Sequence, residues 1–198
     1  MSGTAEIYDA VLDPGKLDLL RGWVRRQDWF DGDPESLEQV TAYRFVDPDG
    51  EVGMESFLLS DGSQTYHVPV TYRGAELSDA ADALVGTTEH SVLGRRWVYD
   101  APADPVYVTE VCRVISHRDT AADHLLVEEG TVTPSPVNIR GGGDGLGQSP
   151  EASPRVLRVV NEENDAEADR PLIGSPGTLS GTWEDGDGTH TAVLVVVT

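Results

Sequence analysis

The chain has 198 residues, of which 38% are hydrophobic and 25% are charged, a composition sufficient for a packed domain and too apolar for wholesale disorder. Its 35 Asp and Glu outweigh its 14 Lys and Arg and give a formal net charge of −21. Such a charge repels phosphate backbones and anionic lipid, so no nucleic-acid or membrane-surface partner is expected. Two explanations of the acidity stay open, namely a surface that favours solubility and a habitat of high salt.

The sequence shows no signal for export or membrane insertion. The N-terminal residues MSGTAEIYDA lack the basic and apolar regions of a signal peptide, and no apolar run approaches the ~20 residues of a membrane-spanning helix. Cys112 is the only cysteine, so an intramolecular disulfide is excluded, and its apolar neighbours favour a buried thiol. We therefore expect a soluble cytoplasmic protein.

The first predicted element is an amphipathic helix over Pro14–Arg26, with its proline in the first turn and Asp13 as the N-cap. The apolar residues Leu17, Leu20 and Val24 recur at helical spacing and so fall on one face. This face is expected to pack against a sheet.

Three runs rich in β-branched and aromatic residues follow the helix, separated by the turn sequences DPDG and SDGS. They predict an antiparallel meander with strands over Gln39–Val46, Val52–Ser60 and Gln64–Arg73. Residues 78–85 suit a short helix or turn with Ser78 as its cap.

Two further strands are expected over Ser91–Asp100 and Pro105–Ser116, joined by the tight turn APADP, and another over His124–Glu129. Residues 133–155, TPSPVNIRGGGDGLGQSPEASPR, are rich in Pro, Gly and Ser and predict a flexible loop. A short strand over Val156–Val160 and a C-terminal hairpin around EDGDG complete the chain.

Sequence motifs that could carry catalysis fail in their details. His117, Arg118 and Asp119 have the letters of a kinase catalytic loop, but His124 stands where that loop needs a metal-binding Asn. The glycine run 141–147 fits neither a dinucleotide-binding nor a phosphate-binding loop. The histidines lack metal-ligand spacing, and no nucleophile adjoins a base. We predict no catalytic, metal or cofactor site and no enzymatic activity.

Three dense motifs lie in the first half of the chain: YHVPVTYRG at Tyr66–Gly74, LVGTTEHSVLG at Leu84–Gly94 and RRWVYDAPADPVYV at Arg95–Val108. Together with LDPGKLDLLRGWVRRQDWF at Leu12–Phe30, in the same order and spacing, they resemble the N-terminal cap domain of the maltokinases. The resemblance covers residues 6–112.

The resemblance implies an α+β fold in which a curved antiparallel sheet wraps around the N-terminal helix, an arrangement likened to cystatins. It also implies a domain without the catalytic residues of the kinase, since the kinase lobes handle ATP and maltose. We expect residues 1–132 to form the cap-like domain and 133–155 a loop. Residues 156–198 are expected to extend the sheet and complete the domain.

Six polar residues of the signature are candidates for a surface that contacts a ligand or a partner: Glu89, His90, Arg95, Arg96, Asp100 and Asp104. The alternative is that they brace the sheet as cross-strand ion pairs. Sequence alone leaves both interpretations open.

Because no kinase signature follows the cap-like region, the first hypothesis is a non-catalytic, stand-alone cap-like protein with an accessory or regulatory role in trehalose, maltose or α-glucan metabolism. Its candidate partner is a sugar kinase or a glucan-metabolising enzyme. The second hypothesis is a small-ligand module that binds a sugar on the concave face of the sheet. An inward-facing polar cluster there would favour the second, and a dry apolar core with polar residues at the rim would favour the first.

Overall fold

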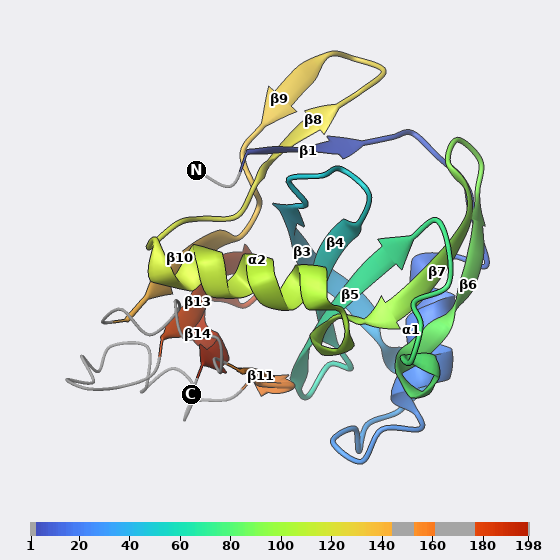
Figure 1. The fold of residues 1–198 in the computed structure, drawn as a ribbon. Coiled ribbons are helices and arrows are strands. Elements are labelled where there is room, and N and C mark those ends of the chain that lie inside the picture. Colours follow the sequence, from blue (N-terminus) through green and yellow to red (C-terminus); the bar gives the residue numbers. More distant parts are fainter. Residues whose placement is uncertain (1–2, 144–152, 161–176, 198) are drawn as a thin grey trace.

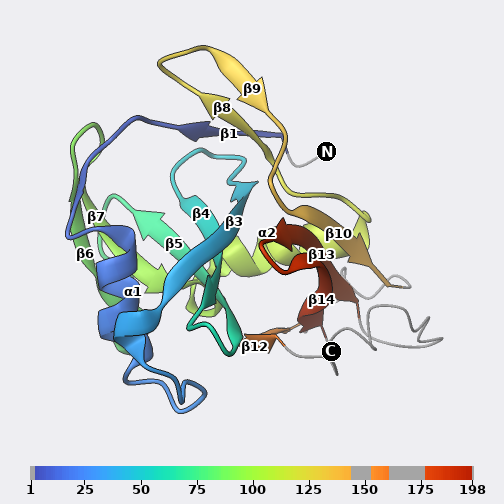
Figure 2. The ribbon, with the colours of Figure 1, turned by 180° about the vertical axis from the view of Figure 1, so that it is seen from behind.

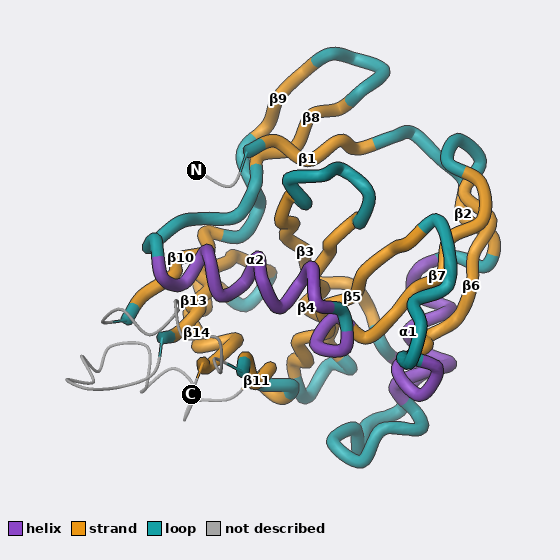
Figure 3. The backbone as a smooth tube through the Cα atoms, viewed as in Figure 1, coloured by secondary structure: helices purple, strands orange, loops and turns teal. Residues whose placement is uncertain are grey.

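The computed structural model describes residues 3–143, 153–160 and 177–197. In these residues two α-helices accompany strands that belong to three sheets (Figures 1 and 3). The helices are α1, Lys16–Val24, and α2, Pro105–Ser116, with short 3-10 turns η1, Pro34–Ser36, η2, Ala81–Ala83, and η3, Ala101–Ala103. The fold is α+β, as the sequence predicts.

The largest sheet is antiparallel and strongly curled, like half of a barrel (Figure 1). Its strand order is β2-β6-β7-β5-β4-β3, and β12 pairs with the first residues of β5 on the edge that β7 leaves open. The strands are β2, Leu12–Asp13, β3, Glu38–Val46, β4, Gly53–Ser60, β5, Thr65–Arg73, β6, Leu84–His90, β7, Gly94–Asp100, and β12, Val159–Val160. The predicted meander of β3, β4 and β5 is confirmed.

The concave face of this sheet holds α1. Alternation along β4 places Phe57 and Leu59 on this face, where they share one core with Leu20 and Trp23 of the helix. Gly86 of β6 permits the close approach, since a Cβ there would lie 2.7 Å from the Cδ2 atom of Leu19. The predicted apolar face of the helix is therefore confirmed, with Leu20 only 2% exposed.

The convex face of the curled sheet is covered by α2 and a second sheet (Figure 2). This antiparallel sheet has the order β10-β13-β14-β11, with β10, Asn138–Gly142, β11, Pro154–Val156, β13, Thr178–Asp185, and β14, Gly188–Val197. Met54 and Leu58 of β4 pack in the same core cluster as Val111 of α2 and Leu179 of β13. Both faces of the curled sheet are thus buried over much of their area.

A third, small sheet lies across the open end of the curled sheet. It pairs β1, Thr4–Ile7, in parallel with β8, Asp123–Leu126, which pairs antiparallel with β9, Thr131–Thr133. In Figure 1 β1 arches over the ends of β3 and β4, whereas α1 packs against β6.

The largest error of the sequence prediction concerns residues 105–116, which form α2 and not a strand. β-branched residues in this run suggested a strand, but Tyr107, Val111 and Val114 are buried at helical spacing. The side chain of Asp104 caps the helix by accepting a hydrogen bond from the backbone N–H of Val106, and Pro105 occupies its first turn. Capping and periodicity outweigh strand propensity here.

Three smaller expectations were also wrong. Asp13 lies in β2, and the N-cap of α1 is Gly15, without a side-chain hydrogen bond. The predicted loop over 133–155 contains β10, whose Ile139 is buried, while residues 144–152 lie outside the described residues. Of the C-terminal strands, β12 extends the curled sheet as expected, but β13 and β14 belong to the second sheet.

One histidine of the signature lies in the core between the two sheets. His67 of β5 is fully buried, and its Nε2 lies 2.9 Å from the hydroxyl of Tyr43. Burial and, to a lesser extent, the charge of Arg158 lower the pKa of His67 from 6.5 to about 3. The imidazole is therefore neutral in the folded protein at neutral pH.

Leu20→Ala should lower the free energy of unfolding by roughly 2–5 kcal/mol, because it opens a cavity between α1 and the concave face. Urea denaturation followed by circular dichroism measures the change. Val132→Ala, at a residue that is 54% exposed on β9, is the control and should change stability little. An unchanged midpoint for Leu20→Ala would mean that α1 does not help to hold the sheet.

His67 should make the fold sensitive to mild acid. His67 has a pKa of about 6.5 in the unfolded chain and about 3 in the folded protein, so between these values only the unfolded chain binds a proton. The free energy of unfolding therefore falls as the pH drops from about 6.5 towards 3. Between pH 7 and pH 5 this loss is about 2 kcal/mol. In His67→Gln the loss over the same interval, measured by urea denaturation, should be smaller by that amount. Equal losses in both proteins would show that His67 does not contribute.

Candidate functional site

A polar cluster occupies the concave face beyond the N-terminal end of α1. Its centre is the carboxylate of Glu55 on β4, a residue only 5% exposed. Lys16 Nζ lies 2.7 Å from Oε2, an Arg44 terminal nitrogen lies 2.7 Å from Oε1, and the hydroxyl of Tyr72 donates to Oε2 at 3.0 Å. These partners come from α1, β3 and β5, so the cluster joins three elements to β4.

Strand register accounts for this convergence. Arg44 and Glu55 are direct cross-strand partners of β3 and β4, which puts both side chains on the concave face. Lys16 is the first residue of α1, and its ammonium lies 5.8 Å from the ring centroids of Phe57 and Tyr72. The first residue of the helix thus places the Lys16 ammonium at the boundary between the apolar and the polar part of the concave face.

The electrostatics of the cluster favour fixed charges over proton transfer. Burial opposes ionisation of Glu55, but the charges of Arg44 and Lys16 and the hydrogen bonds outweigh it, so the pKa of this carboxyl is lowered. Burial and the neighbouring Glu55 raise the pKa of Tyr72 well above its ordinary value. Neither group has a pKa close to 7, where a general acid or base works best.

The β6–β7 hairpin supplies a second wall with two residues of the signature. Val92 and Leu93 donate their backbone N–H groups to Nδ1 of His90, at 3.2 and 3.1 Å, which fixes the orientation of the ring. A terminal nitrogen of Arg96 donates to the carbonyl of Leu93. Burial first, and then the charges of Arg96 and nearby cations, lower the pKa of His90.

Between these walls lies a cavity of about 590 Å³. The strand β1 and the residues after it cover it from above, with Tyr8 placing its ring edge-on to His90 at a centroid distance of 6.1 Å. The cavity has the size and the mixed apolar and polar lining of small-molecule sites. Its polar lining includes one side chain from each of α1, β3, β4, β5, β6 and β7, namely Lys16, Arg44, Glu55, Tyr72, His90 and Arg96.

The structure divides the six residues singled out from sequence into three pairs. His90 and Arg96 line the cavity. Glu89 and Arg95 precede His90 and Arg96 in the sequence, so they lie on the opposite face of the sheet. They are cross-strand partners and form an exposed ion pair of 2.7 Å. Asp100 and Asp104 lie elsewhere, each held by an arginine.

The carboxylate of Asp104 is a structural anchor. It is fully buried and accepts two hydrogen bonds of 2.7 Å from Arg73 while it caps α2. Burial opposes its ionisation, but these hydrogen bonds lower the pKa of Asp104. The signature arginine Arg73 thereby fixes the start of α2 to β5.

Asp100 joins the curled sheet to the C-terminal segment. An Arg158 nitrogen lies 2.6 Å from both oxygens of Asp100, and its guanidinium carbon lies 5.8 and 5.4 Å from the ring centroids of Trp23 and Trp29. Sequence analysis missed Arg158 because nothing local relates it to residues so far away in the chain.

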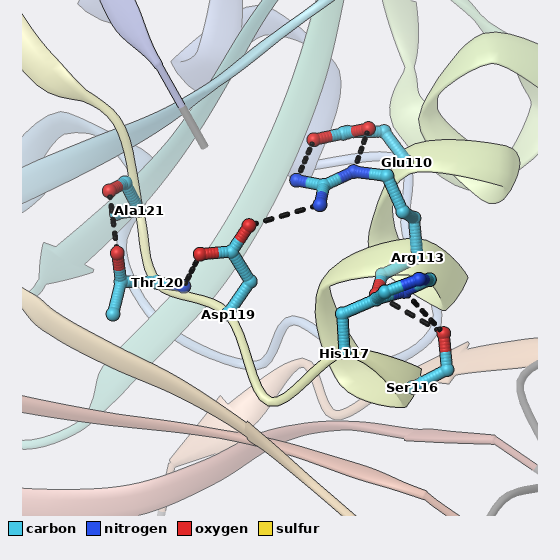
Figure 4. Close-up of polar contacts among 7 residues, drawn as sticks. All are labelled: Glu110, Arg113, Ser116, His117, Asp119, Thr120 and Ala121. Carbon is cyan, nitrogen blue, oxygen red and sulfur yellow. Dashed lines mark hydrogen bonds and ion pairs between the residues drawn. The ribbon is translucent and has the colours of Figure 1, made fainter. Parts of the chain in front are cut away.

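Asp119 of the kinase-like triplet also has a structural role (Figure 4). Arg113 of α2 pairs with Glu110 through two hydrogen bonds of 2.8 Å and reaches Asp119 at 2.9 Å. The other oxygen of Asp119 accepts a hydrogen bond from the backbone N–H of Thr120. The carboxylate thus secures the turn after α2.

Sequence comparison identifies part of the chain. Residues 23–104 match the maltokinase N-terminal cap domain. No curated protein matches the chain. The cap domain runs from the end of α1 to the start of α2 and includes Tyr72, His90 and Arg96, while Lys16 and the second sheet lie outside the match.

The described residues contain no group of three or more His, Cys, Asp or Glu that could hold a metal ion. None of their helices is long and apolar enough to cross a membrane.

Four cavity residues were missed by the sequence analysis: Lys16, Arg44, Glu55 and Tyr72. The sequence carries a signal for two of them. Lys16 is the only lysine of the chain and stands at a helix start, and Glu55 is a lone charge among the apolar residues of the strand MESFLL.

Asp104→Ala should lower the free energy of unfolding by roughly 3–5 kcal/mol, because it leaves Arg73 without its partner and removes the cap of α2. Glu89→Ala removes an exposed carboxylate from a similar arginine pair and should cost at most about 1 kcal/mol. Both values come from chemical denaturation. Similar small losses for the two variants would refute the anchoring role of Asp104.

Proposed function

We propose that this protein is a non-catalytic cap-domain protein that binds a small polar ligand of trehalose, maltose or α-glucan metabolism in its concave cavity. The observation that carries the proposal is the convergence of Lys16, Arg44, Glu55, Tyr72 and Arg96 on one cavity of about 590 Å³. An inward-facing polar cluster of this kind favours ligand binding over a dry structural core.

The polar groups are arranged for recognition. Glu55 is an ionised acceptor whose orientation is fixed by three donors, and Tyr72 offers an aromatic ring with a hydroxyl. Carboxylates, guanidinium groups and rings together suit a ligand with several hydroxyl groups. The family of residues 23–104 supports a sugar as this ligand, because it is named for an enzyme that acts on maltose.

The same chemistry argues against catalysis at this site. The lowered pKa of Glu55 and the raised pKa of Tyr72 leave no group in the cluster ready to exchange a proton near neutral pH. A binding role, in which the ligand controls the cap domain or is delivered to an enzyme, fits the fixed charges better.

A docking role for a sugar kinase or a glucan-metabolising enzyme is the second candidate. It is favoured by three exposed apolar residues, Val11, Val92 and Leu93, which are 73%, 53% and 43% exposed, and of which Leu93 lines the cavity. Ser91 holds them together by exchanging hydrogen bonds with the backbone of Val11. A partner seated there would cover the cavity.

Ligand binding is tested by titrating the ¹⁵N-labelled chain with maltose, trehalose and glucose and following the backbone amide spectrum. We expect shifts at β3, β4 and the β6–β7 hairpin, around Arg44, Glu55 and His90. The amides of α2 and β13 on the convex side serve as the internal control. Shifts confined to these control elements would place binding elsewhere and contradict the proposal.

A further inference from the structure

We propose that the cavity selects an anionic ligand, a sugar that carries a phosphate or carboxylate group, and that Arg96 is its principal anion contact. This inference rests on the proposed function and specifies the chemical class of the ligand. It is carried by the distribution of charge around the cavity and by the unpaired state of one arginine.

The chain has few cations, and three of its 14 Lys and Arg face this one cavity. Lys16 and Arg44 share the single carboxylate of Glu55, which leaves that group of three with one net positive charge. Arg96 adds a second. In a protein with a formal charge of −21, an inner wall with this sign is a marked local exception.

The lining of the cavity also contains the carboxylates of Glu6, Asp47 and Glu51, so the positive charge is local to the wall that Lys16, Arg44 and Arg96 form. Asp47 lies in the turn between β3 and β4, where it accepts hydrogen bonds from the backbone N–H groups of Asp49, Glu51 and Val52. Glu6 is engaged by the hydroxyl of Tyr8 on the covering strand. Glu51 is exposed at the rim.

Two histidines near the cavity sense the positive wall. Burial, followed by the charges of Arg96, Lys16 and Arg44, lowers the pKa of His90. Burial, followed by Arg44, also lowers the pKa of His124, which pairs with Ala5 of the covering strand, although Glu55 and Asp123 act in the opposite direction. Burial is the largest cause of both shifts, and the neighbouring cations act in the same direction.

Arg96 differs from the other arginines of the curled sheet and its surroundings. Carboxylate partners within 2.7 Å are present for Arg44, Arg73, Arg95 and Arg158. Among the described residues Arg96 forms no ion pair, and its buried Nε atom has no hydrogen-bond partner.

The position of Arg96 is nevertheless fixed. One terminal nitrogen donates to the carbonyl of Leu93, and the other lies beside Gly74, where a Cβ would come within 2.9 Å of it. The guanidinium is thus held at the cavity by backbone contacts that leave its charge unneutralised. A planar guanidinium in this state pairs well with the two oxygens of a phosphate or carboxylate.

The test compares glucose 1-phosphate, glucuronate, maltose and inorganic phosphate by isothermal titration calorimetry at low and high salt. At least one charged sugar should bind about tenfold more tightly than maltose, because hydrogen bonds between charged partners are stronger, and added salt should weaken it. Glucose 1-phosphate and glucuronate separate the two anionic groups. Inorganic phosphate shows whether the sugar contributes.

Arg96→Gln should weaken the charged sugar about tenfold, a larger loss than for maltose, because only the charged sugar loses an ion pair. Arg95→Gln is the matched control, since it removes the same charge one residue away on the opposite face, and it should have no effect. Arg96→Lys, which keeps the charge but not the fork, should retain part of the affinity. If Arg96→Gln does not fold, the salt dependence and the Arg96→Lys variant decide the question.

Maltose binding as strong as that of the charged sugars, unchanged in Arg96→Gln, would overturn the anionic preference while leaving the proposed function intact. Failure of every sugar to bind the wild-type chain would overturn both. Equal losses in Arg95→Gln and Arg96→Gln would show an effect of overall charge and would also refute the assignment to Arg96.

Discussion

Strand β4 is buried on both faces, and the remaining architecture depends on how its side chains alternate. Phe57 and Leu59 point to the concave face and meet α1, while Met54 and Leu58 point to the convex face and meet the core shared with α2 and the second sheet. A shift of one residue would exchange these two sets. It would also move Glu55 from the ligand cavity into the apolar convex core, where Lys16 and Arg44 could not reach it. The register of β4 therefore fixes both the packing and the site.

Ion pairs divide the polar residues of the signature between architecture and recognition. Two of these pairs are partly buried. Arg73 of the curled sheet holds Asp104 at the start of α2, and Asp100 of the same sheet holds Arg158 of the C-terminal segment. Removal of either partner leaves a charge in a dry environment, which is strongly destabilising. Among the described residues Arg96 forms no such ion pair. It is available to a ligand because its position is set by backbone contacts and not by a carboxylate.

The acidity of the chain and the cations of the cavity are complementary. A surface with excess carboxylates repels anions at long range, and salt screens this repulsion over about 10 Å at 0.1 M. Within the cavity the nearest charges dominate, and these include the cations Lys16, Arg44 and Arg96. The neutral imidazole of His90 and the fixed carboxylate of Glu55 then offer hydrogen bonds to hydroxyl groups. The proposed selectivity for a ligand with both an anionic group and hydroxyls rests on this combination.

The amino-acid sequence by itself determined the family of the central segment, the meander of β3, β4 and β5, the C-terminal hairpin and the apolar face of α1. These features depend on local spacing, turn residues and contiguous motifs. It misassigned α2, because the β-branched residues suggested a strand, whereas helical periodicity and the cap at Asp104 both favour the helix. The cavity was decided by the tertiary structure alone. Its polar residues come from α1, β3, β4, β5 and the β6–β7 hairpin, and only the curl of the sheet and the placement of α1 bring Lys16, Glu55 and Arg96 to one wall. The same curl separates His90 and Arg96 from Glu89 and Arg95, because neighbouring residues of a strand face opposite sides of a sheet.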